Sequence, residues 1–447
     1  MQEKREMRKK LLCSLIVLSV PTIIEQILST LLQYVDTAMV GHLGEQATAS
    51  VSITTTITWL VGGVPSAIGV AVLALVSRYM GSKDESAVKS MSKQALILVL
   101  VFGILLGGIS LLLSPFIPKW MGAEQAIWRQ ASIYYAIISL PMVFRSASTV
   151  LGAAIRATKD TKTPMIISVI ANVMNIVLNA LFIYGMDLGV TGAAIGSAIS
   201  YTFAGVVMYA AYRKKAVLYY PLKELKADRV QIMECARVGM PVLGTNVASC
   251  FGYVIFASLV SDMGTTTFAA HSIAVTAETI FYIPGYGLRT ATSTLIGHAL
   301  GERDRKKFET VMFLSVFVTM GMMVLNGILL YAAAQPLMQL LTSSSAVAAL
   351  GARMLRLVAF SEPFFGLMII MEGILYGLGR TRYAFIVETF SMWGIRILLT
   401  LFCVKLWHLP LLAVWCCMIA DNVCKAVLLT IPVLSKRFRE GLFVVEG

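Results

Sequence analysis

Seven acidic residues lie within long apolar stretches of this sequence, where an ionised carboxylate is expensive. They are Glu25, Asp36, Glu278, Glu362, Glu372, Glu388 and Asp421. The basic residues of the same stretches, which could neutralise some of these acids, are Arg145, Arg289, Arg356, Arg396 and Lys425. A charge in the centre of a bilayer costs about 2.5 to 3.5 kcal/mol even on lenient insertion scales, so each such acid is a functional hypothesis.

Asp36 differs from the other acids because no basic residue lies near it in its own stretch. In another stretch, Asn175 and Asn179 lie one helical turn apart on one face and supply neutral amide oxygens. A carboxylate together with neutral oxygens suits a proton or a small hard cation such as sodium. The alternative is that the asparagines are hydrogen-bonding contacts between membrane helices. The residues alone leave both interpretations open.

The acids of the second half have possible basic partners. Asp421 and Lys425 are spaced i, i+4 on one stretch, which favours a local ion pair. Glu362 lies six residues after Arg356, and Glu388 lies eight residues before Arg396, so neutralisation inside the second half is an open alternative for both acids. Their roles stay ambiguous at this stage.

The elements that carry these side chains are predicted to be membrane-spanning helices. Hydrophobic residues make up 57% of the chain and charged residues 14%, whereas soluble domains carry roughly 25% charged residues. Stretches of about 20 apolar residues, each able to cross the hydrocarbon as a helix, occur twelve times. They lie near 14–40, 51–76, 95–117, 131–155, 164–185, 190–212, 238–261, 270–298, 311–333, 351–376, 384–406 and 411–434. We therefore expect an all-α polytopic membrane protein of twelve helices.

The second half of the chain repeats the first at an offset of 220 residues. The matches include Pro21 with Pro241, Gly44 with Gly264, Gly81 with Gly301, Asp84 with Asp304 and Thr161 with Thr381. Six spans per copy is an even number, so we expect parallel repeats: two pseudo-twofold-related six-helix bundles with a pathway between them. The expected domains are a lobe at 1–212, a cytoplasmic linker at 213–237 and a lobe at 238–447.

The net charge of +13 is explained by topology rather than by nucleic-acid binding. Most of the 37 lysines and arginines fall in the N-terminus, the even-numbered loops and the C-terminus, and only Lys119, Arg129 and Lys405 fall in odd-numbered loops. The positive-inside rule then places both termini and the linker in the cytoplasm.

Enzymatic and cofactor chemistry finds no support in the sequence. There is no phosphate-binding G-x-x-x-x-G-K-[ST] motif, and the seven cysteines form no spaced C-x-x-C. We expect no catalytic residues, no cofactor, and no metal beyond a possible sodium ion at Asp36, Asn175 and Asn179.

Several segments together resemble the bacterial multidrug and toxic compound extrusion (MATE) transporters, over essentially the full length. They are Val35–Gly44 (VDTAMVGHLG), Leu151–Pro164 (LGAAIRATKDTKTP), Gly189–Ile195 (GVTGAAI), Ala269–His271 (AAH), Gly297–Gly301 (GHALG) and Gly377–Arg382 (GLGRTR). The resemblance implies twelve helices in two lobes. It also implies export of organic cations and other amphipathic compounds, coupled to inward movement of protons or sodium ions across the bacterial plasma membrane.

The resemblance further implies which residues bind the coupling ion. They are Asp36, Asn175, Asn179, Ser197 and Tyr134. One branch of the family has an acid where this chain has Asn179, so a site here holds one carboxylate fewer. Many members carry a glutamate in the seventh span, which this chain lacks in Tyr253–Phe256. Glu278 is therefore the candidate second-lobe acid, with a structural pair to Arg289 or a neighbouring helix as its alternative.

Three other functions compete with multidrug efflux. A lipid-linked oligosaccharide flippase has a similar two-lobed architecture, and Arg145 and Arg289 could contact its anionic substrate. A membrane enzyme would need a cluster of catalytic groups, and a receptor would need a soluble output module. The sequence shows neither feature.

Overall fold

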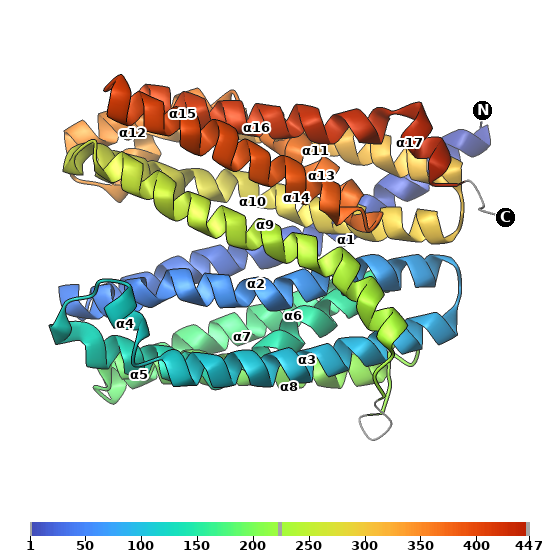
Figure 1. Cartoon of the computed structure of the whole chain (residues 1–447), viewed down its shortest axis with the longest axis horizontal. Coiled ribbons are helices and arrows are strands. Elements are labelled where there is room, and N and C mark those ends of the chain that lie inside the picture. Colours follow the sequence, from blue (N-terminus) through green and yellow to red (C-terminus); the bar gives the residue numbers. More distant parts are fainter. Residues whose placement is uncertain (1, 222–225, 444–447) are drawn as a thin grey trace. The chain divides into compact units, whose positions relative to one another are not determined.

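The computed structural model of this protein describes residues 2–221 and 226–443, and the regular structure within them is entirely helical (Figure 1). The all-α prediction is confirmed. The helices of the first half are α1 (Gln2–Gly41), α2 (Glu45–Gly81), α3 (Glu85–Leu113), α4 (Ile117–Trp120), α5 (Trp128–Ser139), α6 (Met142–Ala157), α7 (Lys162–Ala180) and α8 (Gly189–Lys214). Those of the second half are α9 (Arg229–Ser261), α10 (Thr265–Gly301), α11 (Arg305–Leu341), α12 (Ser345–Ala359), α13 (Glu362–Gly377), α14 (Thr381–Ser391), α15 (Leu398–Leu401), α16 (Leu411–Leu434) and α17 (Lys436–Gly441).

The chain forms two compact units, whose boundaries fall inside helices. The N-terminal unit is Ile24–Leu243, and the C-terminal unit combines Met1–Ile23 with Gly244–Gly447. The division therefore lies within α1 and α9, and not at the predicted linker of 213–237. Helix α9 already begins at Arg229, so the segment between α8 and α9 is shorter than the sequence suggested.

The first turns of α9 belong to the N-terminal unit because they are packed into its core. Cys235 and Val238 are buried in one hydrophobic cluster with residues of α2, α3 and α6. Next to them, the hydroxyl of Tyr79 donates a 2.6 Å hydrogen bond to Glu234 Oε2. Burial of this kind favours a continuous helix over a solvated loop.

The internal repeat is visible in the backbone of the two halves. Helices α2 and α10 begin and end at positions 220 residues apart, and so do α6 and α13. Gly44 and Gly264, which precede α2 and α10, have φ angles of 106° and 101°, a region that favours glycine. Asp84 and Asp304 cap α3 and α11, each accepting a 2.9 Å hydrogen bond from the amide nitrogen three residues later. The residues that begin the helices are therefore the same at equivalent positions of the two halves.

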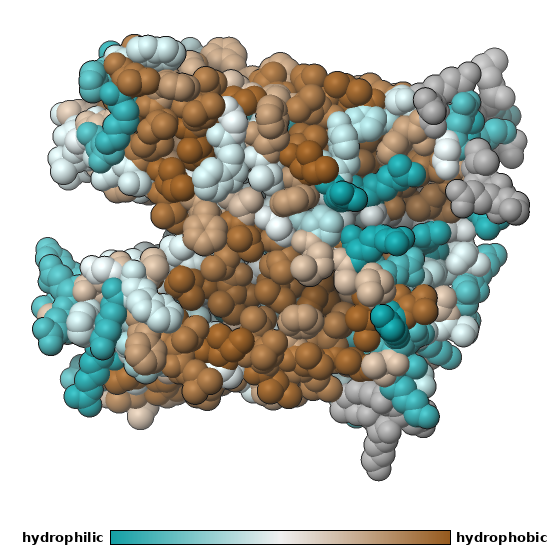
Figure 2. Space-filling model, viewed as in Figure 1, coloured by the Kyte–Doolittle hydropathy of each residue, from teal (hydrophilic) through white to brown (hydrophobic). Residues whose placement is uncertain are grey.

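The described residues contain twelve helical spans, which is the predicted number. Nine single helices are long and apolar enough to cross a membrane, and two bent pairs add one span each. The pairs are Gln125–Ser139 with Met142–Ala157, bent by 48°, and Ser345–Ala359 with Glu362–Gly377, bent by 56°. Helix α10 is 37 residues long and is the repeat counterpart of α2, which makes it the twelfth span. Figure 2 shows apolar surface between hydrophilic ends on the N-terminal unit, as a membrane span requires.

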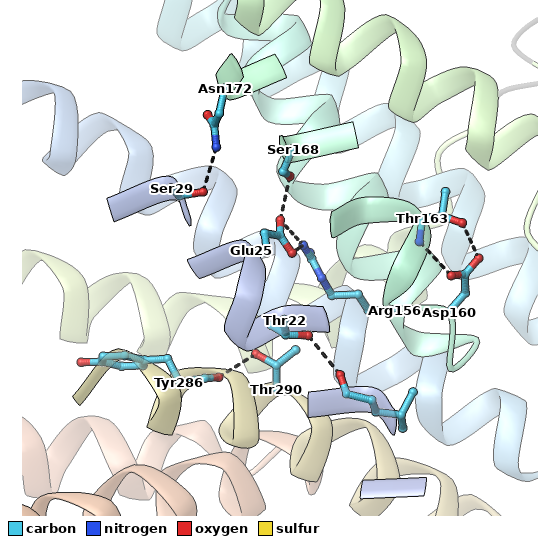
Figure 3. Close-up of polar contacts among 11 residues, drawn as sticks. Thr22, Glu25, Ser29, Arg156, Asp160, Thr163, Ser168, Asn172, Tyr286 and Thr290 are labelled. Atoms are coloured by element: carbon cyan, nitrogen blue, oxygen red, sulfur yellow. Dashed lines mark hydrogen bonds and ion pairs between the residues drawn. The ribbon is translucent and has the colours of Figure 1, made fainter. Parts of the chain in front are cut away.

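Asp160, in the turn between α6 and α7, connects the start of α7 with the end of α8 within the N-terminal unit. Its carboxylate lies 2.8 Å from Lys215 Nζ, at the end of α8. It also accepts hydrogen bonds from the backbone nitrogen and the hydroxyl of Thr163, as Figure 3 shows. Burial raises the pKa of Asp160, but the bonds from Lys215 and Thr163 outweigh burial and hold it below its ordinary value. A lowered pKa stabilises the fold above the unfolded-state pKa of about 3.9, and the stabilisation is lost as the pH falls through the folded-state pKa.

Replacement of Asp160 by asparagine should therefore destabilise the protein in a pH-dependent way. We expect the free energy of unfolding to fall by about 1 kcal/mol at pH 7, the typical worth of such bonds. The difference from the wild type should shrink as the pH falls below about 3.9, because the carboxylate then becomes protonated first in the unfolded chain and, at lower pH, in the folded protein. Thermal unfolding in detergent at several pH values measures this, and a difference that stays constant down to pH 3 would contradict it.

Candidate ion-coupling site

Asp36 of α1 is hydrogen-bonded to the asparagines that the sequence singled out. Asn179 Nδ2 donates to Asp36 Oδ1 and also lies 3.4 Å from Asn175 Oδ1. Asn175 Nδ2 in turn donates to Ser197 Oγ on α8 at 3.1 Å. Four of the five predicted residues thus form one connected chain across α1, α7 and α8, within the N-terminal unit.

Tyr134 of α5, the fifth predicted residue, lies near this chain. It is close enough to Asp36, Tyr201 and Arg145 for their charges to act on it. Arg145 itself is occupied by a cation–π contact, with its guanidinium 5.2 Å from the centre of the Tyr201 ring. Among the described residues, no basic side chain lies within ion-pair distance of Asp36, so its charge has no built-in counterion.

The neutral oxygens around Asp36 could complete a cation site. Asn179 is fully buried, its amide nitrogen donates to both Asp36 and Asn175, and its Oδ1 has no hydrogen-bond partner in the described structure. A buried amide oxygen without a donor is costly unless something binds it. The donor set of one carboxylate, amide oxygens and a hydroxyl fits a proton or sodium ion. No group of three or more His, Cys, Asp or Glu side chains is placed for metal binding in residues 2–221 and 226–443.

A widened turn follows this chain but is not specific to it. Residues Leu181–Gly185, directly after α7, form a π-helix, a rare element often found at functional sites. Phe402–Leu406 forms a π-helix at nearly the repeat-equivalent position, where no acid corresponds to Asp36. The π-turn is therefore a feature of the repeated fold, and the Asp36 carboxylate is what distinguishes the N-terminal unit.

A second feature of α1 and α7, which sequence analysis missed, is a series of polar pairs in constant register. Ser168 Oγ donates to Glu25 Oε1 at 2.7 Å and Asn172 Nδ2 to Ser29 Oγ at 3.0 Å, and the Asp36–Asn179 pair continues the series. All three pairs are 143 residues apart in sequence, as expected for two parallel helices in contact. We call this series the α1–α7 ladder.

The ladder ends in an ion pair at Glu25. Arg156 Nη2 lies 2.8 and 2.7 Å from the two oxygens of the Glu25 carboxylate (Figure 3). Arg156 was not among the predicted intramembrane bases, because it lies one residue beyond the predicted span of 131–155. The polar residues recurring on both stretches at matching spacings were the signal that could have identified the ladder.

The acids of the C-terminal unit are arranged differently from the prediction. The predicted Asp421–Lys425 pair is confirmed at 3.0 Å, but Asp421 also binds Arg396 at 2.8 Å. Arg396 is therefore not the partner of Glu388, one of whose carboxylate oxygens is buried without a hydrogen bond among the described residues. Arg396 pairs with Asp421 of α16 and not with Glu388, and the nearby basic groups that act on Glu388 are Lys425 and Arg289.

Glu362 likewise is not paired with Arg356. Arg356 lies over the ring of Tyr331, 5.9 Å from its centre, and the buried Glu362 Oε2 has no hydrogen bond in the described structure. Glu278 is buried and lies within charge range of Arg396 and Glu362. Its alternative pairing with Arg289 is not present, because Arg289 binds Glu372 at 2.8 Å.

The family model described as MatE matches residues 21–181 and again residues 241–402, one match in each half. The chain belongs to the MatE family. This is a family of transporters, not of enzymes. The two matches also agree with the internal repeat, because they begin 220 residues apart.

Known proteins resemble the chain over almost its whole length. It is 26% identical to the "Probable multidrug resistance protein NorM" of Thermotoga maritima, over 98% of this chain and 95% of that protein. A solved structure described as the outward-facing conformation of a multidrug resistance MATE family transporter has a TM-score of 0.90 at 20% identity, covering 96% of each chain. A MOP superfamily transporter from Pyrococcus furiosus, described as having a binding pocket of reverse polarity that suggests a different function, has a TM-score of 0.91 at 20% identity, covering 100% of this chain and 99% of that one. The two structures support the fold and leave the substrate open.

Gly196 of α8 allows Asn179 to reach Asp36. A methyl group at this position would collide with Asn179 Oδ1 and lie 3.2 Å from its backbone nitrogen. We expect Gly196→Ala to displace the Asn179 amide and to lower ion-driven transport by about tenfold or more, since hydrogen bonds to charged groups contribute about 1.5–3 kcal/mol. Efflux from proteoliposomes measures this.

Gly108→Ala on α3 is the matched control, because a methyl group there meets no atom within 4 Å. It should leave transport unchanged and stabilise the helix slightly. Equal transport by the Gly196→Ala and Gly108→Ala variants would contradict the role assigned to Asn179.

Proposed function

We propose that this protein is a secondary active multidrug efflux antiporter, which exports organic cations and amphipathic compounds in exchange for protons or sodium ions. The observation that carries the proposal is the Asp36 carboxylate, which lacks a basic partner in the described structure and contacts Asn179 instead. The name of the Thermotoga relative supports multidrug export. Because one fold can serve several functions, as the Pyrococcus structure illustrates, the substrate must be argued from the site and tested.

In this proposal, Asp36 binds the coupling ion in one conformation and releases it in the other. An exchange of this kind requires that the bound ion favour one conformation, since a ligand with equal affinity for both shifts no equilibrium. The α1–α7 ladder gives α1 a set of polar contacts that can change together with the state of Asp36. The Asn175 and Asn179 oxygens hold the ion, and Ser197 and Tyr134 fix the asparagines and the surroundings of the carboxylate.

The membrane potential drives such a cycle when the exchange moves net charge, as when one ion is exchanged for an uncharged amphipathic compound. One charge that crosses the full potential gains about 2.3 kcal/mol per 100 mV. At about 1.4 kcal/mol per tenfold concentration ratio, this supports a substrate gradient of roughly 40-fold. A chemical gradient of protons or sodium ions would add to it. A monovalent organic cation exchanged for one ion moves no net charge, and the chemical gradient of the ion then drives its export.

The experiment that tests the proposed function is efflux of a fluorescent organic cation from proteoliposomes under separately imposed proton and sodium gradients. Acceleration by one gradient and not by the other would support antiport and identify the ion. The orientation with both termini in the cytoplasm of a bacterial plasma membrane belongs to the same proposal, and protease accessibility of the termini in everted vesicles checks it. Folded protein that exports no cation under either gradient would contradict the proposal and favour the oligosaccharide flippase.

A further inference from the structure

A groove of about 1070 Å³ runs along α11 within the C-terminal unit, beside the first turns of α1. Its lining residues on α11 recur at helical spacing, so they form one face of that helix. They are Lys306, Glu309, Thr310, Phe313, Leu314, Val316, Phe317 and Met320, and Met7, Arg8 and Asp304 complete the wall. From Lys306 to Met320 the face extends about 21 Å at 1.5 Å per residue. The groove is long enough for the chain of a lipid.

The polar end of the groove has two basic side chains that are not engaged by acids. Of the two acids there, Glu309 is neutralised by Arg305, whose Nε lies 3.1 Å away, and Asp304 keeps its charge while it accepts the capping hydrogen bond of α11. Arg8 and Lys306 are exposed, and no carboxylate of the described residues lies within ion-pair distance of either. These two charges outweigh the single remaining charge of Asp304, so the polar end favours an anion.

The other end of the groove is apolar and exposed. Phe313 and Phe317 are 56% and 78% exposed, on a helix that is long and apolar enough to span a membrane. Water does not reach such a face within the hydrocarbon, so its natural contact is an acyl chain. One end suited to an anion and one suited to hydrocarbon, on a single helix face, match the two parts of a phospholipid.

We propose that this groove binds an anionic phospholipid, with the phosphate on Arg8 and Lys306 and one acyl chain over Phe313 and Phe317. Basic residues at this end of the spans place the groove at the leaflet predicted to be cytoplasmic, where anionic lipids attract Lys and Arg side chains. The lipid would tie the start of α1 to α11, both in the C-terminal unit. The proposal does not depend on what the protein exports.

The test is photo-crosslinking of the full-length protein in phosphatidylcholine nanodiscs. Trace phosphatidylglycerol or phosphatidylcholine carries a diazirine in the acyl chain, and the labelled peptides are identified by mass spectrometry. We expect phosphatidylglycerol to label the peptide containing Phe313 and Phe317 about 30-fold more than phosphatidylcholine does, the preference that two basic residues near the surface confer. In the Arg8→Gln/Lys306→Gln variant this preference should disappear.

Two further variants keep the test decisive. Lys83→Gln/Lys162→Gln removes the same charge from exposed positions of the N-terminal unit and should retain the preference. Thr310→Trp fills the groove without changing charge and should abolish labelling of the α11 peptide. Equal labelling by the two lipids in the wild type, or a preference that survives Arg8→Gln/Lys306→Gln, would overturn the proposal.

Discussion

Replacement of Asp36 by asparagine is expected to abolish ion-driven efflux. Asparagine has nearly the same shape and can keep a hydrogen bond to Asn179, but it neither binds a proton nor carries a charge for a cation. The ion-driven part of the substrate gradient should be lost, and the probe should reach only the passive distribution seen in vesicles without the protein. The measurement is steady-state accumulation of a fluorescent organic cation in energised everted vesicles.

The control for this variant is Asp187→Asn, an exposed position in the N-terminal unit. Asp187 has a φ angle of 54°, which asparagine tolerates well, so the fold should be unchanged. This variant should transport like the wild type. Undiminished accumulation by folded Asp36→Asn would move coupling away from α1 and make Glu278 the next acid to test.

Replacement of Asp421 by asparagine is expected to cause the largest loss of stability. Asp421 is fully buried and is shared by Arg396 and Lys425, whose side chains are 5% and 10% exposed. Without its carboxylate, two buried cations lose their counterion, and breaking a buried pair in this way costs about 3–5 kcal/mol. Chemical or thermal unfolding of the purified protein in detergent measures the change.

The matched control is Asp262→Asn, which breaks the exposed pair with Lys405, about half exposed on both sides. Solvent screens such a pair, so its loss should cost at most about 1 kcal/mol. The double variant Asp421→Asn/Lys425→Met should recover part of the stability, because it removes one of the unpaired cations. Equal destabilisation by Asp421→Asn and Asp262→Asn would contradict the prediction that the buried cluster contributes more to stability than the exposed pair.

The sequence was most informative where the backbone itself requires a residue type. Gly44 and Gly264 precede equivalent helices and have positive φ angles. Asp84 and Asp304 cap another equivalent pair of helices, so the repeat could be recognised at these positions. The linker was predicted less well. Its second part mixes charged and apolar residues, some of them exposed, and hydropathy did not show that Cys235 is buried in the N-terminal unit.

Ion pairing within the second half could be predicted only for Asp421 and Lys425 and stayed open for Glu362 and Glu388, because sequence distance does not fix the direction of a side chain. Arg356 and Glu362 lie on opposite sides of the 56° bend between α12 and α13, so six residues do not bring them together. Glu388 and Arg396 are separated by the start of the π-helix Met392–Ile397, whose wider turn changes the face that Arg396 presents. Local spacing rules assume a straight α-helix, and they succeeded for Asp421 and Lys425 on the regular α16.

The candidate site was predicted in part. The i, i+4 spacing placed Asn175 and Asn179 on one face, and the family resemblance connected them to Asp36, Ser197 and Tyr134. The α1–α7 ladder was not predicted, because pairing between two distant helices depends on their register. Glu25 therefore appeared among the unassigned acids, although Arg156 and Ser168 both contact it.

The most direct test of the proposed coupling is release of the ion when the exported compound binds. Purified protein loaded with radioactive sodium, or held in weak buffer with a pH-sensitive dye, is mixed with a transported organic cation. The wild type should release about one sodium ion or proton per protein molecule, and the Asp36→Asn variant should release none. Equal release by the two proteins would contradict the assignment of Asp36 as the residue that couples ion binding to export.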